Sequence, residues 1–118
     1  MSRRTGPDAK TCAVVMLRDA GRCRRCGEIG HQIQHRLARG SGGSRNPMVN
    51  NLSALVLVCL KCHDEIENRE RAAAFRTGWA VKHGIERPSE IPLVDVRGRA
   101  FFLTEEGGVV YVTGNVPP

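Results

Sequence analysis

The chain has 118 residues, enough for one small domain, and its hydrophobic content of 41% excludes wholesale disorder. Only 4% of residues are aromatic, so the core is small and a bound metal would add appreciably to stability. The net charge is +6, and residues 1–46 carry all of the excess, with ten basic and three acidic residues. This bias favours a polyanionic partner such as nucleic acid, although an ordinary basic surface explains it equally well. No stretch approaches the roughly 18 apolar residues of a membrane span, and no apolar signal core follows the N-terminal arginines, so we expect an intracellular protein without a membrane partner.

The first third of the chain predicts an arm, a helix and a strand. Residues 1–10 are expected to form a flexible basic arm, and a short helix should follow over about residues 11–20. Thr11 is a plausible N-cap, and Gly21 is well placed to end the helix. Residues 31–37 alternate in character and predict a short strand with two histidines on one face.

The middle of the chain predicts a second strand followed by a helix. Residues 39–51 read as a basic, glycine-rich loop that either wraps a phosphate backbone or is a plain linker. Residues 52–58 are continuously apolar and predict a buried strand. A helix rich in good helix formers should run from about residue 60 to residue 76, and Gly78 is its natural stop. Trp79 is expected to be a core anchor rather than a base-stacking residue.

The tail predicts antiparallel strands joined by glycine-containing turns. The expected strands are residues 93–96, 100–104 and 109–113. We therefore predict an α+β fold, with a main domain over residues 11–92 and a C-terminal β-hairpin or meander extension over residues 93–118.

Four of the five cysteines form two Cys-x-x-Cys pairs, which are Cys23 with Cys26 and Cys59 with Cys62. Two such pairs are typical of a structural zinc site, because each pair brings two thiolates to the ion from a tight turn. The 32 residues between the pairs leave room for a whole supersecondary unit. The second pair followed by His63 also fits the haem-attachment pattern, but haem attachment needs export and leaves the first pair unexplained.

Two histidines and a carboxylate predict a hydrolytic site. On a helix that starts near residue 60, His63 and Glu67 are four residues apart and share one face, where they could hold a divalent ion or form a surface pair without function. A phosphodiesterase needs a base, a metal and basic groups that hold the backbone. Here His35 could be the base, and Gln34 could join the two metal ligands. The candidate DNA-binding residues are Arg36, Arg39 and Arg45.

In combination, these segments resemble the HNH endonucleases, a family with a ββα-metal fold, in the zinc-knuckle form common in phage genomes. The matching stretches are Cys23-x-x-Cys26, residues 34–43, residues 50–55, Cys59-x-x-Cys62-His63-x-x-Ile66-Glu67, and the helix end at Gly78-Trp79. The resemblance covers about residues 10–95. It implies a small ββα-metal core, stapled by zinc, that cuts DNA.

The resemblance also implies a role for each site residue. His35 corresponds to the general base, and His63 and Glu67 to ligands of a catalytic Mg²⁺ or Mn²⁺. The family usually has Asp, Glu or His before the base, where this chain has the neutral Gln34. The family's middle asparagine lies five residues before the third cysteine, which is Ala54 here; Asn50 and Asn51 are close but out of that register.

Three functions are open on this basis. The first is a metal-dependent DNA endonuclease or nickase. The second is an HNH-derived DNA-binding zinc module that cuts weakly or not at all, as the departures at Gln34 and Ala54 suggest. The third is a zinc-stapled protein-interaction domain that docks through its tail hairpin. The family resemblance further implies a phage protein in the host cytoplasm, acting beside a packaging terminase.

Overall fold

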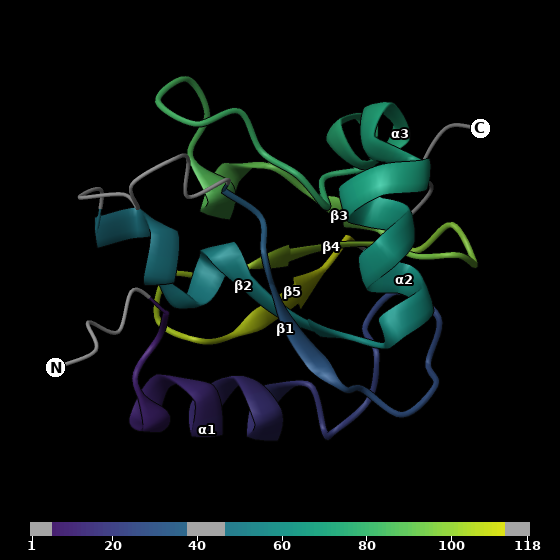
Figure 1. Ribbon diagram of the computed structural model, residues 1–118. Coiled ribbons are helices and arrows are strands. Elements are labelled where there is room, and N and C mark those ends of the chain that lie inside the picture. Colours follow the sequence, from purple (N-terminus) through teal and green to yellow (C-terminus); the bar gives the residue numbers. More distant parts are fainter. Residues whose placement is uncertain (1–5, 38–46, 113–118) are drawn as a thin grey trace, which may run out of the picture.

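The computed structural model describes residues 6–37 and 47–112, in which helices surround two small antiparallel sheets (Figure 1). The α-helices are α1 (Ala9–Arg18), α2 (Leu60–Asp64) and α3 (Arg71–Arg76), and a π-helical turn, η3 (Glu65–Arg69), joins the last two. The strands are β1 (Gln32–His35), β2 (Leu55–Val58), β3 (Leu93–Val94), β4 (Ala100–Leu103) and β5 (Val109–Tyr111). Short 3₁₀ helices are η1 (Pro47–Asn50), η2 (Leu52–Ala54) and η4 (Pro88–Glu90). The predicted α+β class is confirmed. No helix among the described residues combines the length and apolar character needed to cross a membrane.

Helix α1 starts earlier than the sequence predicted. Its N-cap is Asp8, whose carboxylate accepts a hydrogen bond from the Thr11 backbone N–H at 2.8 Å. A carboxylate both satisfies a free N–H and interacts favourably with the positive end of the helix dipole, so it displaces Thr11 as the cap. The helix ends at Arg18, and the chain reverses through Ala20 and Gly21 at φ of 55° and 70°.

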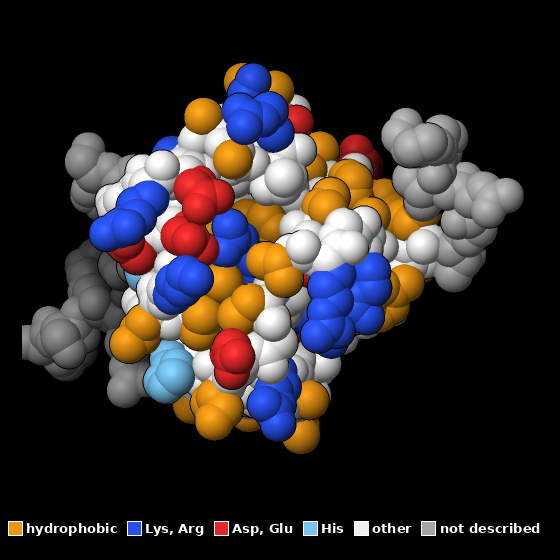
Figure 2. Space-filling model, turned by 90° about the vertical axis from the view of Figure 1, so that its right-hand side faces the viewer, with side chains coloured by type: hydrophobic (Ala, Val, Ile, Leu, Met, Phe, Trp, Pro, Cys, Tyr) orange, Lys and Arg blue, Asp and Glu red, His pale blue; other side chains and the backbone are white. Residues whose placement is uncertain are grey.

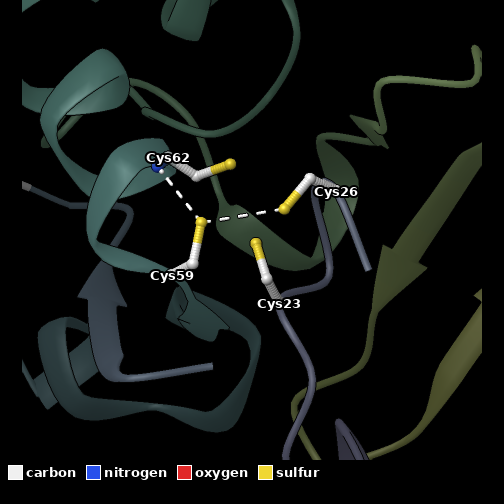
Figure 3. A group of neighbouring side chains, drawn as sticks. All are labelled: Cys23, Cys26, Cys59 and Cys62. Atoms are coloured by element: carbon white, nitrogen blue, oxygen red, sulfur yellow. Dashed lines mark hydrogen bonds between the residues drawn. The ribbon is translucent and has the colours of Figure 1, made fainter. Parts of the chain in front are cut away.

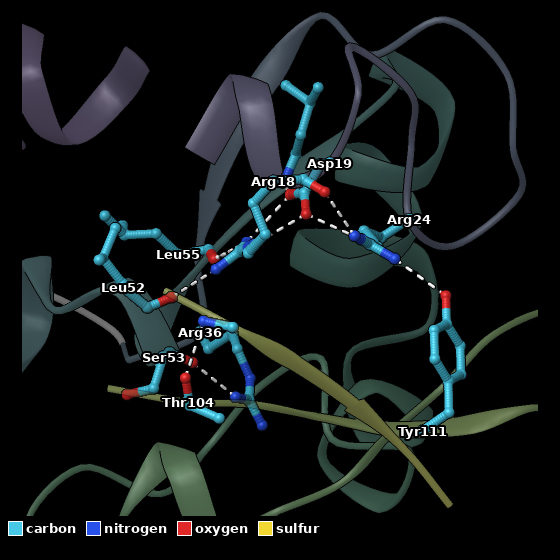
Figure 4. A network of polar contacts seen from close by, with 11 residues as sticks. Arg18, Asp19, Arg24, Arg36, Leu52, Ser53, Leu55, Thr104 and Tyr111 are labelled. Atoms are coloured by element: carbon cyan, nitrogen blue, oxygen red, sulfur yellow. Dashed lines mark hydrogen bonds and ion pairs between the residues drawn. The ribbon is translucent and has the colours of Figure 1, made fainter. Parts of the chain in front are cut away.

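A buried charge network fixes α1 against the strands (Figure 4). Arg18 donates to the carbonyl oxygens of Leu52 and Leu55 at 2.7 and 2.6 Å. It also pairs with Asp19, whose carboxylate accepts from Arg24 as well, at 2.7 Å. Because Arg18 and Asp19 are desolvated, removal of Asp19 would leave the buried Arg18 charge without its carboxylate partner. The network therefore holds the first cysteine turn in a fixed place beside β2.

Strands β1 and β2 form an antiparallel pair in which Gln32 faces Val58 and His35 faces Leu55. All of β2 is buried, as the apolar run predicted. Both strands are shorter than expected. Strand β2 begins only at Leu55 because residues 52–54 form the 3₁₀ turn η2. Asn51 caps this turn by accepting a hydrogen bond from the Ser53 backbone N–H at 2.9 Å.

The predicted helix over residues 60–76 is present but interrupted, since the π-helical turn η3 separates α2 from α3. Gly78 follows at a φ of 83°, where a Cβ atom would lie 1.9 Å from the Pro92 carbonyl oxygen, so only glycine fits. Trp79 is 1% exposed, and its indole N–H donates to the Val94 carbonyl at 2.8 Å. The expectation that Trp79 anchors the core is confirmed.

The tail forms the predicted meander, with strands in the order β3-β4-β5 and antiparallel pairing throughout. Leu93, Phe101 and Leu103 belong to the same hydrophobic cluster as Trp79 and the cysteines. The Phe101 ring meets Trp79 edge-on at 6.1 Å between centroids. The tail is thus part of the main core rather than an appended extension. The first half of the predicted arm (1–5) and the last residues (113–118) lie outside the described residues.

Candidate metal centre and hydrolytic site

The four paired cysteines meet in one cluster, drawn in Figure 3. Their sulfur atoms all lie within 4.8 Å of one another, and none forms a disulfide. The Cys26 and Cys59 sulfurs are 3.7 Å apart. Four thiolates at ~2.3 Å from a tetrahedral zinc are separated by about 3.8 Å, so the spacing fits such an ion. The cluster could therefore hold a structural metal ion such as zinc.

Local backbone geometry brings the cysteines together from two elements. Cys59 is the N-cap of α2, and its sulfur accepts from the Cys62 backbone N–H at 3.4 Å. Cys23 and Cys26 lie on a turn that Gly27 closes at a φ of 88°. Arg25 connects the two halves, since its guanidinium donates to the Cys62 sulfur at 3.2 Å and to Glu65 at 2.6 Å. Donors to sulfur of this kind offset the negative charge of a tetrathiolate site.

The four clustered thiols can all lose their protons only if a cation compensates the resulting negative charge. Burial raises the pKa of Cys26 and of Cys62, and at Cys62 the hydrogen bond from Arg25 only partly opposes the rise. At Cys59 burial also acts upward, but hydrogen bonds from Cys62 and the neighbouring thiols lower the pKa overall. Four adjacent thiolates repel one another, so their joint deprotonation requires a bound metal.

A second group of polar side chains joins β1 to the helix that follows β2. The Gln34 amide lies between His63 and Glu67: its Oε1 is 2.6 Å from His63 Nδ1, and its Nε2 donates to Glu67 Oε1. Nε2 also donates to the His35 carbonyl at 3.1 Å. Because Glu67 and that carbonyl are acceptors, the amide nitrogen must face them and Oε1 must accept from a protonated Nδ1. The neutral His63 ring then has its lone pair on Nε2.

This arrangement gives Gln34 a more specific role than the sequence indicated. Gln34 is fully buried, and both ends of its amide are engaged. It orients His63 and Glu67, the two expected metal ligands, in the way that residues behind a metal site fix its ligands. An imidazole nitrogen and a carboxylate oxygen on neighbouring turns are groups that could hold a divalent metal ion.

His35, the expected general base, is paired with Asn50. The distance from His35 Nε2 to Asn50 Oδ1 is 2.9 Å. This contact with the asparagine amide holds the imidazole ring in one orientation. A general base needs a ring that is held in place in this way.

The asparagine that contacts His35 is not at the position that the sequence comparison with the family indicated. Counting back from Cys59 pointed to Ala54, which is buried and makes only backbone hydrogen bonds among those described: its carbonyl accepts from the Arg36 N–H and its N–H donates to the Asn51 carbonyl, both at 2.8 Å. Asn50, at the end of η1, makes the contact instead. The 3₁₀ turn η2 lies between Asn50 and β2, so a residue count back from Cys59 does not find Asn50. In the sequence, the only sign of this contact is that an asparagine lies nearby. His35 thus contacts an asparagine even though position 54 is an alanine.

Arg36 is not available to DNA, contrary to the prediction. Its side chain is 0% exposed, and the guanidinium donates to four carbonyl oxygens from three segments of the chain. The acceptors are Gly78 at 2.8 Å, Ser53 at 2.7 Å, Pro88 at 3.0 Å and Ile91 at 2.8 Å. Burial lowers the pKa of Arg36 to about 9, so it stays charged at neutral pH. Arg36 therefore links the end of β1 to the turns that contain Ser53, Gly78 and Pro88.

The other two predicted DNA contacts, Arg39 and Arg45, lie outside the described residues. Comparison of the chain with known protein families, curated proteins and solved structures finds no match.

Proposed function

We propose that the chain is a metal-dependent DNA endonuclease or nickase of the HNH type, with His35 as its general base. One observation carries the proposal: consecutive residues of β1, Gln34 and His35, engage the two halves of a hydrolytic site. Gln34 bonds to His63 and Glu67 on the helix, while His35 bonds to Asn50. A strand pair followed by a helix beside four cysteines is the arrangement that the ββα-metal resemblance implies.

The residues divide the work of hydrolysis between them. His35 accepts a proton from the attacking water, and Asn50 holds its ring so that the acceptor nitrogen keeps one direction. His63 and Glu67, aligned by Gln34, would hold Mg²⁺ or Mn²⁺. When bound, that ion supplies stabilisation of the charge that develops on the phosphate and on the leaving oxygen. Gln34 contributes by keeping His63 in the tautomer that presents Nε2.

The four cysteines, in this proposal, bind zinc and have a structural role. They join the turn that precedes β1 to the N-terminus of α2. Strand β1, with Gln34 and His35, follows the first cysteine turn, and His63 and Glu67 follow the second cysteine pair. Zinc bound to both pairs would therefore hold β1 against the helix. A site held within a fraction of an ångström requires such support.

Plasmid nicking tests the proposal. The wild-type protein, loaded with zinc and supplied with Mg²⁺ or Mn²⁺, should convert supercoiled DNA to the open form. His35→Ala should reduce the rate by about 10²-fold or more, the usual contribution of a general base. His83→Ala is the control, since it changes an exposed histidine of the connector. Equal nicking by wild type and His35→Ala would refute the assignment.

A DNA-binding module that no longer cuts is the second candidate, and the engagement of Gln34 favours it. The neutral amide bonds to both expected ligands, where the family has a charged or imidazole side chain. This candidate predicts salt-dependent DNA binding without cleavage by wild type. Gln34→Asp should then restore metal-dependent nicking, and failure to do so would remove the basis of this alternative. Absence of DNA binding at low salt would favour the protein-interaction domain instead.

A further inference from the structure

The structure has a basic pocket that none of the proposed hydrolytic residues lines. Its volume is about 370 Å³, and its walls come from the end of α1, the first cysteine turn, the β3–β4 turn and β5. Five arginines line it: Arg22, Arg24, Arg25, Arg97 and Arg99. The cysteine turn and the β3–β4 turn lie at the right of Figure 1, on the face that Figure 2 views. Figure 2 shows Lys and Arg side chains in separate groups over that face.

Three of the five arginines are committed to partners within the protein. Arg24 pairs with Asp19 and donates to the Tyr111 hydroxyl at 2.9 Å (Figure 4). Arg25 pairs with Glu65, and Arg99 pairs with Asp95 at 2.9 Å. These contacts fix the three arginine side chains in place, and the carboxylates of Asp19, Glu65 and Asp95 balance most of their positive charge.

Arg22 and Arg97 are different. Both are exposed, and within the described part of the chain neither guanidinium makes a hydrogen bond or an ion pair. They come from two turns that are distant in sequence, and both line the pocket together with the buried Cys23. A zinc tetrathiolate beneath the pocket would carry a charge of −2, so the two uncommitted guanidinium groups decide whether an anion binds here.

We propose that this basic pocket binds phosphate groups of the DNA backbone and so positions the duplex while the separate hydrolytic site acts. The choice of DNA as the anion rests on the proposed function. A pocket for a free nucleotide would be mostly apolar with a few polar groups, whereas charged side chains dominate here. Arginines that project from two turns suit a continuous strand that passes both.

Fluorescence anisotropy with a labelled DNA duplex tests the proposal. The measurements use full-length, zinc-loaded protein in a His35→Ala background without added Mg²⁺ or Mn²⁺, so that binding is read without cleavage. Arg22→Ala/Arg97→Ala removes both uncommitted charges. Lys10→Ala/Lys82→Ala is the matched control, because it removes two exposed charges that do not line the pocket. Each protein is titrated over about 50 to 200 mM salt.

The pocket variant should bind DNA about 10-fold more weakly at low salt and lower the slope of log affinity against log salt by ~2, one unit for each lost phosphate contact. The control should change both quantities much less. Equal losses in the two variants, an unchanged slope in the pocket variant, or no DNA binding by the parent would each overturn the proposal. Excess ATP that saturates the pocket without displacing DNA would overturn it as well. Because folding could confuse the result, the zinc content and melting temperature of both variants should equal those of the parent.

The two proposals fail in different ways. If wild type does not nick DNA yet Arg22→Ala/Arg97→Ala binds it more weakly, the hydrolytic assignment is refuted and the pocket assignment stands. If nicking depends on His35 but the pocket variant binds DNA as the parent does, the pocket assignment alone is refuted.

Discussion

Replacement of the buried arginine should be among the most damaging single changes in this fold. In Arg36→Met, the side chain keeps most of its length but loses the guanidinium, so the carbonyls of Gly78, Ser53, Pro88 and Ile91 each lose one hydrogen bond, and Pro88 keeps only the bond from the Ile91 N–H. Hydrogen bonds to charged groups contribute about 1.5–3 kcal/mol each, and bonds that share one group are not additive. We therefore expect a loss of about 4 kcal/mol, close to the cost of breaking a buried charged contact.

Such a loss is a large share of the ~5–15 kcal/mol that stabilises a domain of this kind. Urea denaturation at constant zinc measures it directly, because Trp79 is the only tryptophan and is buried in the core. Arg36→Lys keeps a charge and up to three donors but not the planar fork, so it should lose about 2 kcal/mol.

Arg76→Met is the matched control, since it makes the same chemical change at an exposed position at the end of α3. It should change the free energy of unfolding by less than about 0.5 kcal/mol. If Arg36→Met loses no more than the control, Arg36 does not hold these carbonyls, and a role in DNA contact becomes open again.

Further predictions concern the base, the metal and the surface charges. Asn50→Ala should slow nicking by roughly 10-fold or more because the His35 ring loses its fixed orientation, whereas Ala54→Asn should not raise the rate. Cys59→Ser should lose bound zinc, as measured by mass spectrometry, and should unfold at a much lower temperature, since structural zinc contributes about 10 kcal/mol in small domains. The Arg87 guanidinium lowers the pKa of Glu105 below its ordinary 4.5. Because the folded-state pKa is the lower one, this stabilisation is present above the unfolded value and is lost as pH falls through the folded value. Glu105→Gln should therefore lower the melting temperature slightly near neutral pH and leave it unchanged in strong acid.

Local chemistry made much of this fold predictable. The spacing of the cysteine pairs, the stop at Gly78 and the glycine turns of the tail each act over a few residues, and the structure contains the cysteine cluster, the helix end and the meander that they predicted. The π-helical turn η3 was not predicted, because residues 65–69 contain ordinary helix formers and nothing in the pattern marks an extra residue per turn.

The errors at Arg36 and Asn50 have a common physical origin. Arg36 stands among other basic residues in the sequence, but its acceptors come from segments 17 to 55 residues away, which only the tertiary fold brings together. Asn50 reaches His35 because two 3₁₀ turns shorten the path of the chain before β2. In both cases the residues close by in sequence do not indicate which distant residue will be the partner.

Anomalous diffraction from crystals of the zinc-loaded protein soaked in Mn²⁺ tests the central claim most directly. The account predicts a zinc peak at ~2.3 Å from the sulfurs of all four paired cysteines. It also predicts a manganese peak in contact with a nitrogen of His63 and an oxygen of Glu67, on the side facing His35. Manganese bound elsewhere, or sulfurs without a shared metal, would contradict the claim that a zinc-held strand and helix form a hydrolytic centre.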